Sequence, residues 1–453
     1  MPARTAVLPL TTTATPEPVR SVVALIALLG ALTALAPLTI DLYLPAFPTI
    51  EADFATTESA VQMTLTGSLI GVALGQLIIG PLSDAYGRRP PLLFAVVGYV
   101  LASIGCAVAP TVELLGGARV LQGMAAAAGG VIAMAVIRDL FDGLRGVQML
   151  SRLILVVGVA PIIAPTVGSV VLAFTHWRGV FWLLAVVGVV LAVAGMIGMR
   201  ETLPAERRQP AGIRPTLRTY GRLLRERTMV GLLLTGGFVF AQIFAYVSGS
   251  SFVLQNQYGL TTSQFGLVFG LNSLGLVIMS QVNPVLLRSR DPQDVLSIAL
   301  VVGGVATVLL LVATTTGALG LAGILIPLFV ILSMAGLSLP NVPGLALATH
   351  GRTAGSAAAL LGGANFAVGA VVAPLVGVLP VAPATSMAVV MAAMSAAALT
   401  AYFWVARPGR IPAFDRVPAP AGSDQPDVEE LTAEVRAPSA LVPEPVGCGV
   451  RAD

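Results

Sequence analysis

The sequence has few charged residues. Only 10% of its 453 residues are Asp, Glu, Lys or Arg, whereas 56% are hydrophobic. An ordinary soluble domain carries about 25% charged residues, so this chain cannot cover a surface that faces water. The shortage of charge excludes a cytosolic enzyme, a disordered protein and a secreted disulfide scaffold, and it predicts a polytopic membrane protein.

Lysine is absent, and cysteine and histidine are scarce. All 25 basic residues are Arg. Cys106 lies in an apolar run and Cys448 near the C-terminus, so we expect neither a disulfide framework nor a Cys-based metal site. His176 and His350 fall in predicted loops and are not expected to be ligands. The sequence therefore predicts no metal and no cofactor.

Long apolar runs, by contrast, fill most of the chain. A helix that crosses a bilayer needs about 20 mostly apolar residues. Strands cross membranes only as closed barrels, whose sequences alternate between apolar and polar residues. Continuous runs therefore predict an all-α integral membrane protein with 12 transmembrane helices, at about 21–43, 61–80, 91–110, 114–137, 149–174, 179–199, 229–253, 264–287, 295–315, 319–347, 353–380 and 384–406.

A charged segment divides these runs into two sets of six. Eight arginines lie between Arg200 and Arg227. Such a segment could be a tether, a partner site or an amphipathic helix on the inner leaflet, and we favour a tether that contains some helix. The predicted organisation is an N-terminal cytoplasmic segment, a six-helix bundle, a cytoplasmic linker, a second six-helix bundle and a disordered cytoplasmic tail, at 1–20, 21–199, 200–228, 229–406 and 407–453.

The arginines predict the orientation of the helices. If the N-terminus is cytoplasmic, 20 of the 22 arginines up to Arg410 fall in cytoplasmic segments and only Arg178 falls in an external one. This bias places both termini in the cytoplasm of a multi-pass cell-membrane protein. It also explains the basic pI without nucleic acid, because such arginines face anionic lipid headgroups. Twelve spans suffice for one pathway, so we expect a monomer.

Two charged residues fall inside predicted spans. Asp41 lies near the outer end of the first span and Arg119 in the first third of the fourth. Charge inside a membrane costs about 2.5–3.5 kcal/mol on insertion scales, so each such residue is a functional candidate. A buried carboxylate beside an arginine suits a group that binds and releases a proton. The alternatives are a helix-end carboxylate that touches water and a snorkelling or packing arginine.

A second group of charges lies between the second and third spans, in GPLSDAYGRRP. A hairpin of some ten residues is expected here, with an Asp–Arg pair at i,i+4 and a glycine that can adopt positive φ. A carboxylate at the end of the fourth span offers the arginine another partner. A simple positive-inside turn would explain only the arginines. The predicted gating cluster is Gly80, Asp84, Gly87, Arg88, Arg89 and Asp139.

Other candidates are uncharged. Polar residues within or beside the spans could bond a neighbouring helix or line a substrate cavity; they are Tyr43, Gln122, Gln242, Tyr246, Asn272, Asn341 and Asn365. In the fifth span, small and proline residues could kink the helix or form a hinge and allow close helix approach. These are Gly158, Pro161, Pro165 and Gly168.

These motifs resemble those of a known family. GPLSDAYGRRP resembles the loop signature of the major facilitator superfamily, ARVLQGMAAAAGG its fourth-helix R-x-x-Q-G motif, and APIIAPTVGS the drug–proton antiporter motif, with Ala164 and Ser169 in place of two glycines. DLYLPAFPTI, WRGVFW, ETLP, LPNVPGLAL and AGSAAALLGG resemble the Bcr/CflA multidrug resistance branch. The second-half loop NPVLLRSRDPQDV lacks the signature spacing. The resemblance, over roughly 21–406, implies two six-helix pseudo-repeats, a gating network around Arg88, and a role in proton transfer for Arg119.

The sequence offers no phosphate-binding loop of the Walker type, so ATP is not expected to drive transport. We therefore expect proton-coupled efflux of small amphipathic drugs by alternating access, with the cluster around Arg88 stabilising the outward-open state. The alternative is a proton-coupled importer of the same superfamily. A channel or a membrane-embedded enzyme is less consistent with the sequence, which shows neither a polar-lined pore nor a group of catalytic residues.

Overall fold

The computed structural model describes residues 19–141, 143–208, 213–348 and 354–410. Every regular element among these residues is a helix, and none is a strand. The predicted N-terminal segment, apart from its last two residues, lies outside the described residues, and so does the tail beyond Arg410. His350 and Cys448 also lie outside them. Six long helices precede the linker: α1 (Val19–Asp41), α3 (Glu58–Tyr86), α4 (Arg89–Ala107), α5 (Val112–Leu140), α6 (Gly143–Phe174) and α7 (Trp177–Gly198).

Six long helices also follow the linker: α9 (Arg227–Ser251), α10 (Thr262–Leu286), α11 (Pro292–Thr316), α12 (Ala322–Ala348), α13 (Ala354–Val372) and α14 (Pro383–Thr400). Wide turns of π-helix extend α9 and α14 over Phe252–Gln257 and Ala401–Ala406. In the described ranges, 11 helical segments are long and apolar enough to cross a membrane, and α6, 32 residues long, has a shorter described apolar part at Gly158–Phe174. The predicted all-helical membrane fold is confirmed.

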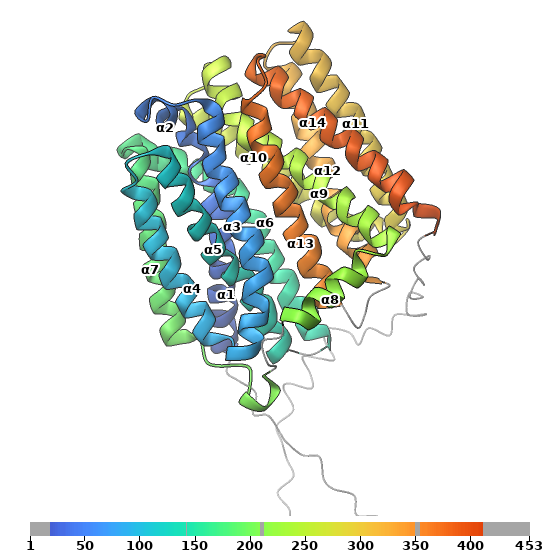
Figure 1. Ribbon diagram of the computed structural model, residues 1–453. Coiled ribbons are helices and arrows are strands. Elements are labelled where there is room, and N and C mark those ends of the chain that lie inside the picture. Colours follow the sequence, from blue (N-terminus) through green and yellow to red (C-terminus); the bar gives the residue numbers. More distant parts are fainter. Residues whose placement is uncertain (1–18, 142, 209–212, 349–353, 411–453) are drawn as a thin grey trace, which may run out of the picture. The chain divides into compact units, whose positions relative to one another are not determined.

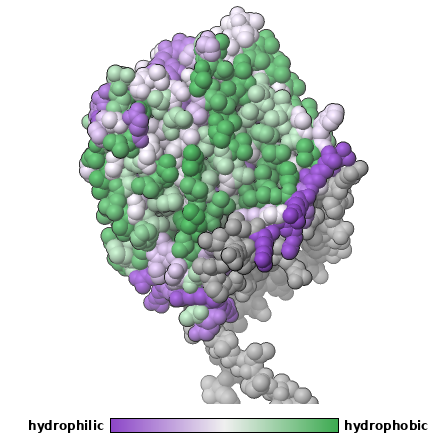
Figure 2. All heavy atoms as spheres, viewed as in Figure 1, coloured by the Kyte–Doolittle hydropathy of each residue, from purple (hydrophilic) through white to green (hydrophobic). Residues whose placement is uncertain are grey.

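Shorter elements lie between these helices. They are η1 (Leu44–Ala46) and α2 (Phe47–Asp53) after α1, η2 (Ala205–Arg207) and α8 (Ile213–Leu223) in the linker, η5 (Ala373–Gly377) after α13, and η7 (Pro408–Arg410) after α14. The linker therefore contains a helix of 11 residues, and α9 begins within its predicted range. Figure 2 shows a broad hydrophobic surface over the long helices, with hydrophilic residues collected at the ends of the helices and over α8.

Threonines begin several of the long helices. The Thr57 side chain accepts a hydrogen bond from the Ala60 N–H at the start of α3, and Thr111 does the same for Leu114 at the start of α5. These bonds satisfy N–H groups that a first helical turn leaves without partners. Side-chain caps thus define the starts of α3 and α5, whereas α4 and α7 begin without one.

The connection between α3 and α4 is much shorter than the predicted ten-residue hairpin. Helix α3 continues past Pro81 to Tyr86, and only Gly87 and Arg88 separate it from α4. The hairpin prediction is therefore wrong. The polar residues of this segment are spaced like neighbours on a helix, so the helix carries them to its own end instead of breaking before them.

We call the end of the helices where α3 meets α4 the linker end, because the linker leaves α7 there, and we call the opposite end the distal end. The helices before the linker pack with one another, as do those after it, and the two sets meet where α3 contacts α13 and where α6 contacts α10 (Figure 1). We refer to these sets as the first and second halves. The contact of α3 with α13 and η5 runs from Ser59 against Gly377 to Leu77 against Gly363, so a relative rotation of the halves changes a long surface.

Hydrogen bonds close the distal end. Six of them join described residues of the two halves, and all six lie toward that end. The Ser251 hydroxyl donates to the Leu44 carbonyl at 2.8 Å, and the Ser169 hydroxyl donates to the Thr262 carbonyl at 2.9 Å. The structure therefore represents a conformation that is closed at the distal end.

Candidate functional site

A cavity of about 280 Å³ lies between the two halves. Its walls come from two long helices of the first half and four of the second. The residues that line it are Ala36, Pro37, Ile40 and Asp41 of α1, Gly158 and Pro161 of α6, Phe240, Ile243, Phe244, Tyr246 and Val247 of α9, Phe269, Ser273, Leu276 and Val277 of α10, Leu332 and Leu339 of α12, and Phe366 of α13. Nearly all of these side chains are apolar, so the cavity suits an apolar or amphipathic molecule.

Asp41 is the only ionisable acid or base among the residues that line this cavity, apart from the phenol of Tyr246. It is the last residue of α1, and 5% of its surface is exposed. Its carboxylate forms no ion pair with a described residue. A buried carboxylate without an ionic partner is costly in its charged form, so Asp41 is a candidate for binding a proton or a cation in the cavity.

Aromatic rings form much of the cavity wall contributed by the second half. The rings of Phe240, Phe244 and Phe366 form one group, with centroids 4.9 Å apart between Phe240 and each of the other two. The ring of Tyr246 stacks on Phe269 at 5.1 Å. Aromatic faces attract cations as well as apolar groups. A molecule in the cavity can therefore contact one carboxylate and a broad aromatic surface at the same time.

Tyr246 is the one predicted cavity candidate that the structure places in this wall. Its hydroxyl accepts a hydrogen bond of 3.0 Å from the Asn272 side chain, which stands behind it on α10. Gln242 instead donates to Thr307 on α11 at 2.8 Å. Asn365 does not line the cavity, and its Oδ1 has no partner among the described residues.

Asn341 joins two helices of the second half. Its Nδ2 donates to Oδ1 of Asn283 on α10 at 2.7 Å and to the Leu337 carbonyl at 2.8 Å, and both asparagines are buried. For Asn341, Gln242 and Asn272, the helix-bonding alternative therefore describes the geometry better than a cavity-lining role does. Polar side chains inside a membrane protein tend to pair across helix contacts. The sequence of one helix does not predict which helix supplies the partner.

Arg119 lies on α5 in the interior of the first half and is fully buried. Its guanidinium carbon lies 4.0 Å from the ring centroid of Tyr43 and 5.6 Å from that of Phe181. Its Nη1 donates to Oε1 of Gln122 at 2.7 Å, while its Nε and Nη2 have no hydrogen-bond partner among the described residues. A desolvated cation–π contact contributes about 2 kcal/mol, so aromatic rings rather than an acid hold this cation.

Asp41 and Arg119 are not in direct contact, since no ion pair joins them. Tyr43 follows Asp41 by two residues and lies under Arg119, so the end of α1 links the two charged groups. Tyr43 and Gln122 pack inside the first half and not at the cavity, with Gln122 donating to the Ser103 hydroxyl at 2.8 Å.

The four α6 residues divide between two surfaces. Gly158 and Pro161 line the cavity. Gly168 faces the Leu42 backbone so closely that a Cβ at this position would overlap the Leu42 carbonyl. The Pro165 carbonyl accepts a 2.8 Å hydrogen bond from the Ser169 hydroxyl. Close approach of α1 to α6 therefore explains Gly168, and it brings the Asp41 end of α1 against the helix that carries the two prolines.

An ion-pair cluster at the linker end brings together three of the predicted charged residues. Arg88 Nη1 lies 2.5 Å from Asp84 Oδ1, and Arg88 Nε lies 2.8 Å from Asp139 Oδ2. Gly87 has a φ of +92°, which its lack of a side chain permits. Gly80 lies on α3 and is not tightly confined, because a Cβ at this position would lie 3.9 Å from the nearest neighbouring side-chain atom. All these residues belong to the first half, and the link between this cluster and the outward-open state stays a prediction.

Glu201, just after α7, extends this cluster, although the sequence did not single it out. Its Oε1 accepts the Arg88 N–H at 2.8 Å, and its Oε2 accepts the Arg89 N–H at 3.2 Å. Arg89 in turn donates from Nη2 to the Met196 carbonyl at 2.8 Å. The ETLP motif was the only signal in the sequence, because a glutamate at the end of a span is otherwise unremarkable. Glu201 thus ties the start of the linker to the start of α4.

Glu201 also gives a prediction for stability. Burial alone raises the pKa of this carboxyl, but the backbone N–H groups of Arg88, Leu203 and Arg89 and the charge of Arg208 together hold it below its ordinary value. A lowered folded pKa stabilises the protein above the unfolded pKa, and this contribution is lost as pH falls through the folded pKa. Because Glu201 is exposed to solvent, we expect Glu201→Gln to lower the melting temperature at pH 7 by only about 1–2 °C.

A thermal-shift series in detergent from pH 7 to pH 4 measures this effect. The difference between wild type and Glu201→Gln should shrink as the pH falls. Glu206→Gln is the matched control, since Glu206 is exposed in the same linker and forms no ion pair with a residue that the structure describes. A difference that grows toward pH 4 contradicts the assignment.

Two bundles of apolar helices around a nearly apolar cavity are the architecture of a membrane transporter. A family model described as Major Facilitator Superfamily matches residues 29–374. The chain therefore belongs to the Major Facilitator Superfamily.

Similarity to individual proteins indicates the branch of the superfamily. The chain is 40% identical over 357 residues to the uncharacterized MFS-type transporter YdgK of Bacillus subtilis (strain 168), covering 78% of this chain and 89% of YdgK. It is 31% identical over 383 residues to the bicyclomycin resistance protein homolog of Haemophilus influenzae, covering 83% and 94% of the two chains. These relatives confirm the resemblance to the Bcr/CflA-like branch.

Solved structures share the fold. A bacterial homologue of the human lysosomal transporter Spinster, in an inward-facing and occupied conformation, matches with a TM-score of 0.66 at 15% identity, covering 88% of this chain and 98% of that one. The xylose transporter XylE from E. coli, in a partially occluded inward open conformation, matches with a TM-score of 0.65 at 13% identity, covering 88% and 99%. At such identities the likeness concerns the fold and not the substrate.

Proposed function

We propose that this transporter exports small amphipathic compounds in exchange for protons. The observation that carries the proposal is Asp41, the single acid in an otherwise apolar and aromatic cavity between the two halves. Two relatives support export, because their names refer to bicyclomycin resistance and to multidrug resistance; the second is MdtL of Escherichia coli, 28% identical over 243 residues.

The proposed orientation puts the linker end in the cytoplasm. Arg88, Arg138 and the arginines of the linker lie at that end, and cytoplasmic loops of membrane proteins carry an excess of Arg. The distal end, with Arg178, then faces the outside. In this orientation the six hydrogen bonds between the halves keep the external side closed.

The proposed transport cycle depends on competition between the compound and a proton for the Asp41 carboxylate. With the external side closed, a compound from the cytoplasm or the inner leaflet occupies the cavity, and deprotonated Asp41 pairs with its positive charge, while Phe240 and Phe244 contact its apolar part. Rocking of the halves breaks the distal hydrogen bonds and exposes the cavity to the outside. A proton then takes the place of the compound on Asp41 and permits the return.

Arg119 has a positioning role in this proposal. It stacks on Tyr43, which lies in the turn that follows Asp41, so it fixes the end of α1 from inside the first half. It also places a positive charge behind that turn without forming an ion pair with Asp41. Arg119 therefore holds the turn that places the Asp41 carboxylate at the cavity.

One carboxylate implies exchange of one proton for one compound. For a monovalent cation the net charge moved is zero, whereas each uncompensated charge would feel about 2.3 kcal/mol per 100 mV. Efflux of a monovalent cation should therefore depend on the pH gradient and not on the membrane potential.

Everted vesicles from a host without other exporters test the proposal. With an acidic lumen, a fluorescent monovalent amphipathic cation should accumulate inside vesicles that contain the protein. Nigericin, which removes the pH gradient, should abolish accumulation, and valinomycin with potassium, which removes the potential, should leave it nearly unchanged. Loss of the compound from the lumen together with protons would identify an importer instead.

A further inference from the structure

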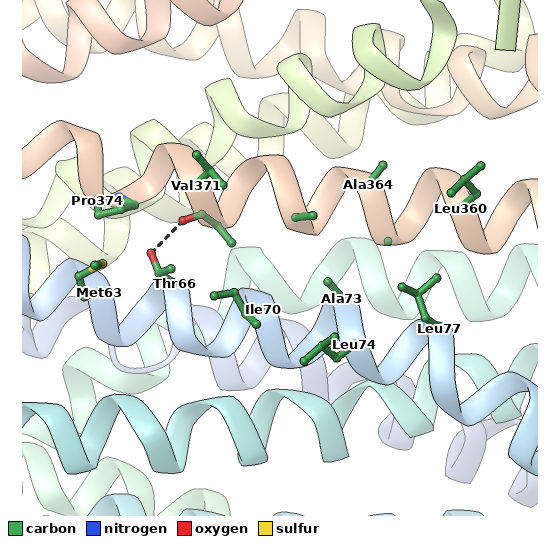
Figure 3. A pocket seen from close by; sticks show the side chains of 13 residues that line it. Met63, Thr66, Ile70, Ala73, Leu74, Leu77, Leu360, Ala364, Val371 and Pro374 are labelled. Atoms are coloured by element: carbon green, nitrogen blue, oxygen red, sulfur yellow. Dashed lines mark hydrogen bonds between the residues drawn. The ribbon is translucent and has the colours of Figure 1, made fainter. Parts of the chain in front are cut away.

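A second hollow lies on the outer surface of the molecule, apart from the central cavity. It is a groove of about 630 Å³ between α3 of the first half and α13 of the second. Figure 3 shows its side chains on the two facing helices. They are Met63, Thr66, Ile70, Ala73, Leu74 and Leu77 of α3, and Leu360, Gly363, Ala364, Ala367, Ala370, Val371 and Pro374 of α13 and the turn after it.

The groove is long, and it runs parallel to the helices. On α3 it extends from Met63 to Leu77, and on the antiparallel α13 side from Pro374 to Leu360, which is 15 residues, or 14 steps between residues, on each wall. At 1.5 Å per residue this is about 21 Å. One leaflet contributes about 15 Å of hydrocarbon to a typical bilayer. The groove is therefore longer than one leaflet is thick, and an acyl chain of one leaflet fits within it.

The lining of the groove is hydrocarbon. Thr66 is its only polar side chain, and its hydroxyl already donates to the Ala370 carbonyl at 3.0 Å, as Figure 3 also shows. Met63 and Val371 on the rims are 55% and 68% exposed, although they lie within transmembrane helices. In a membrane, this exposed surface faces lipid tails. The groove thus recognises a flexible apolar chain and offers nothing to a polar ligand.

Positive charge lies near the linker end of this groove. Helix α8 packs against α13, and its buried Leu223 belongs to the same apolar cluster as Ala357 and Leu361, beside the groove residue Leu360. Arg218 and Arg222, one helical turn apart on α8, are exposed and form no ion pair with a described residue. In the view that Figures 1 and 2 share, α8 lies below α13, and its hydrophilic band borders the hydrophobic surface of the long helices.

We propose that the groove and α8 together bind one anionic phospholipid of the leaflet at the linker end. An acyl chain lies in the groove between α3 and α13, and the phosphate lies at Arg218 and Arg222. A zwitterionic lipid would bring the same chain but no net charge for the two arginines, and polybasic segments at a membrane surface favour anionic lipids. Chain and headgroup are thus recognised by two surfaces that adjoin each other where α8 packs against α13.

The two walls of the groove belong to different halves. A rotation of the halves that separates or shears α3 and α13 changes its width, so a lipid in it favours the conformation in which the groove has the present shape. The lipid therefore shifts the equilibrium between conformations of the transporter, and it is not itself transported. This inference depends only on the groove and on α8 and does not require the proposed drug–proton exchange.

Lipid retention tests the proposal without a transport assay. Wild type, Ala367→Phe and Arg218→Gln/Arg222→Gln are purified in a mild detergent and offered phosphatidylglycerol or phosphatidylcholine, and bound lipid is counted by native mass spectrometry. Ala367 is exposed in the groove, so a phenyl ring there occupies the chain site without displacing a buried neighbour. The controls are Ala393→Phe, an exposed alanine on α14, and Arg288→Gln/Arg290→Gln, two exposed arginines after α10.

We expect wild type and both controls to retain one phosphatidylglycerol per protein in preference to phosphatidylcholine. Ala367→Phe should retain at least fivefold less of either lipid, and the α8 variant should bind the two lipids equally. Equal loss in Ala367→Phe and Ala393→Phe, or equal loss of preference in the two arginine variants, would overturn the proposal. Unchanged retention in all four variants would overturn it as well.

Discussion

Asp41→Asn is expected to abolish proton-coupled accumulation while leaving the amount of protein in the membrane unchanged. Asparagine has nearly the shape of aspartic acid, but it neither binds a proton in this pH range nor pairs with a cation as a carboxylate does. One proton moving down a gradient of one pH unit supplies about 1.4 kcal/mol, which supports a tenfold concentration ratio. In everted vesicles with such a gradient, the ratio of a monovalent dye should fall from about tenfold to none.

Folding should survive this change, because the Asp41 side chain forms no ion pair that the substitution would break. Glu51→Gln is the matched control. Glu51 is an acid at the same distal end, on α2, and it lies outside the cavity. Accumulation by Asp41→Asn at the level of wild type would remove Asp41 from the mechanism, whereas equal loss in Glu51→Gln would show that external acids act nonspecifically.

The sequence predicted the architecture because the bilayer leaves little choice. A chain with continuous apolar runs must satisfy its backbone in helices, and the runs at 61–80 and 114–137 lie within α3 and α5. Asp41 could be singled out for a similar reason. Charge is so rare in the predicted spans that its few occurrences stand out.

The cavity wall could not be predicted in the same way. Gln242 and Tyr246 are polar groups four positions apart on α9, so they share one face of the helix, and which of them faces the cavity depends on the distant helices that lie beside α9 at each level. The structure turns Tyr246 to the cavity and Gln242 to Thr307 on α11. A sequence pattern contains the polarity of each residue but not the identity of the helix that it will contact.

Glu201 was overlooked for a different reason. Its role comes from accepting backbone N–H groups of Arg88 and Arg89, and backbone donors are the same for nearly every residue type. No spacing of side chains reveals such a partner. The first-half cluster therefore contains two ion pairs that the sequence indicates and hydrogen bonds from backbone N–H groups that it does not.

Helix α3 contains a further feature that the structure explains, a series of glycines at every fourth position. Gly67, Gly71 and Gly75 lie on the face of α3 that packs against α5. A Cβ at Gly67 would lie 2.6 Å from the Gly116 carbonyl oxygen, and one at Gly75 would lie 2.5 Å from the Met124 carbonyl oxygen. Small residues at this spacing allow the backbones of membrane helices to touch, so this contact fixes α5, and with it Arg119, against α3.

Gly71→Leu is expected to reduce the amount of folded protein in the membrane several-fold. A Cβ at Gly71 would overlap the Val120 carbonyl and lie 2.8 Å from the Met124 backbone nitrogen, and a backbone cannot move aside as a flexible side chain can. Overpacking of a tight contact costs about 1–3 kcal/mol and occasionally more, and leucine adds a whole branched side chain at this point. Fluorescence size-exclusion chromatography of a tagged protein measures the loss.

Gly98→Leu is the matched control for this prediction. Gly98 lies within α4, and no atom beyond its own helix lies within 4 Å of an added Cβ. Since leucine favours a helix over glycine by up to about 1 kcal/mol, this variant should fold at least as well as wild type. If Gly71→Leu also folds normally, α3 and α5 are not held at backbone contact, and the tight glycine face is not what positions Arg119 behind the Asp41 turn.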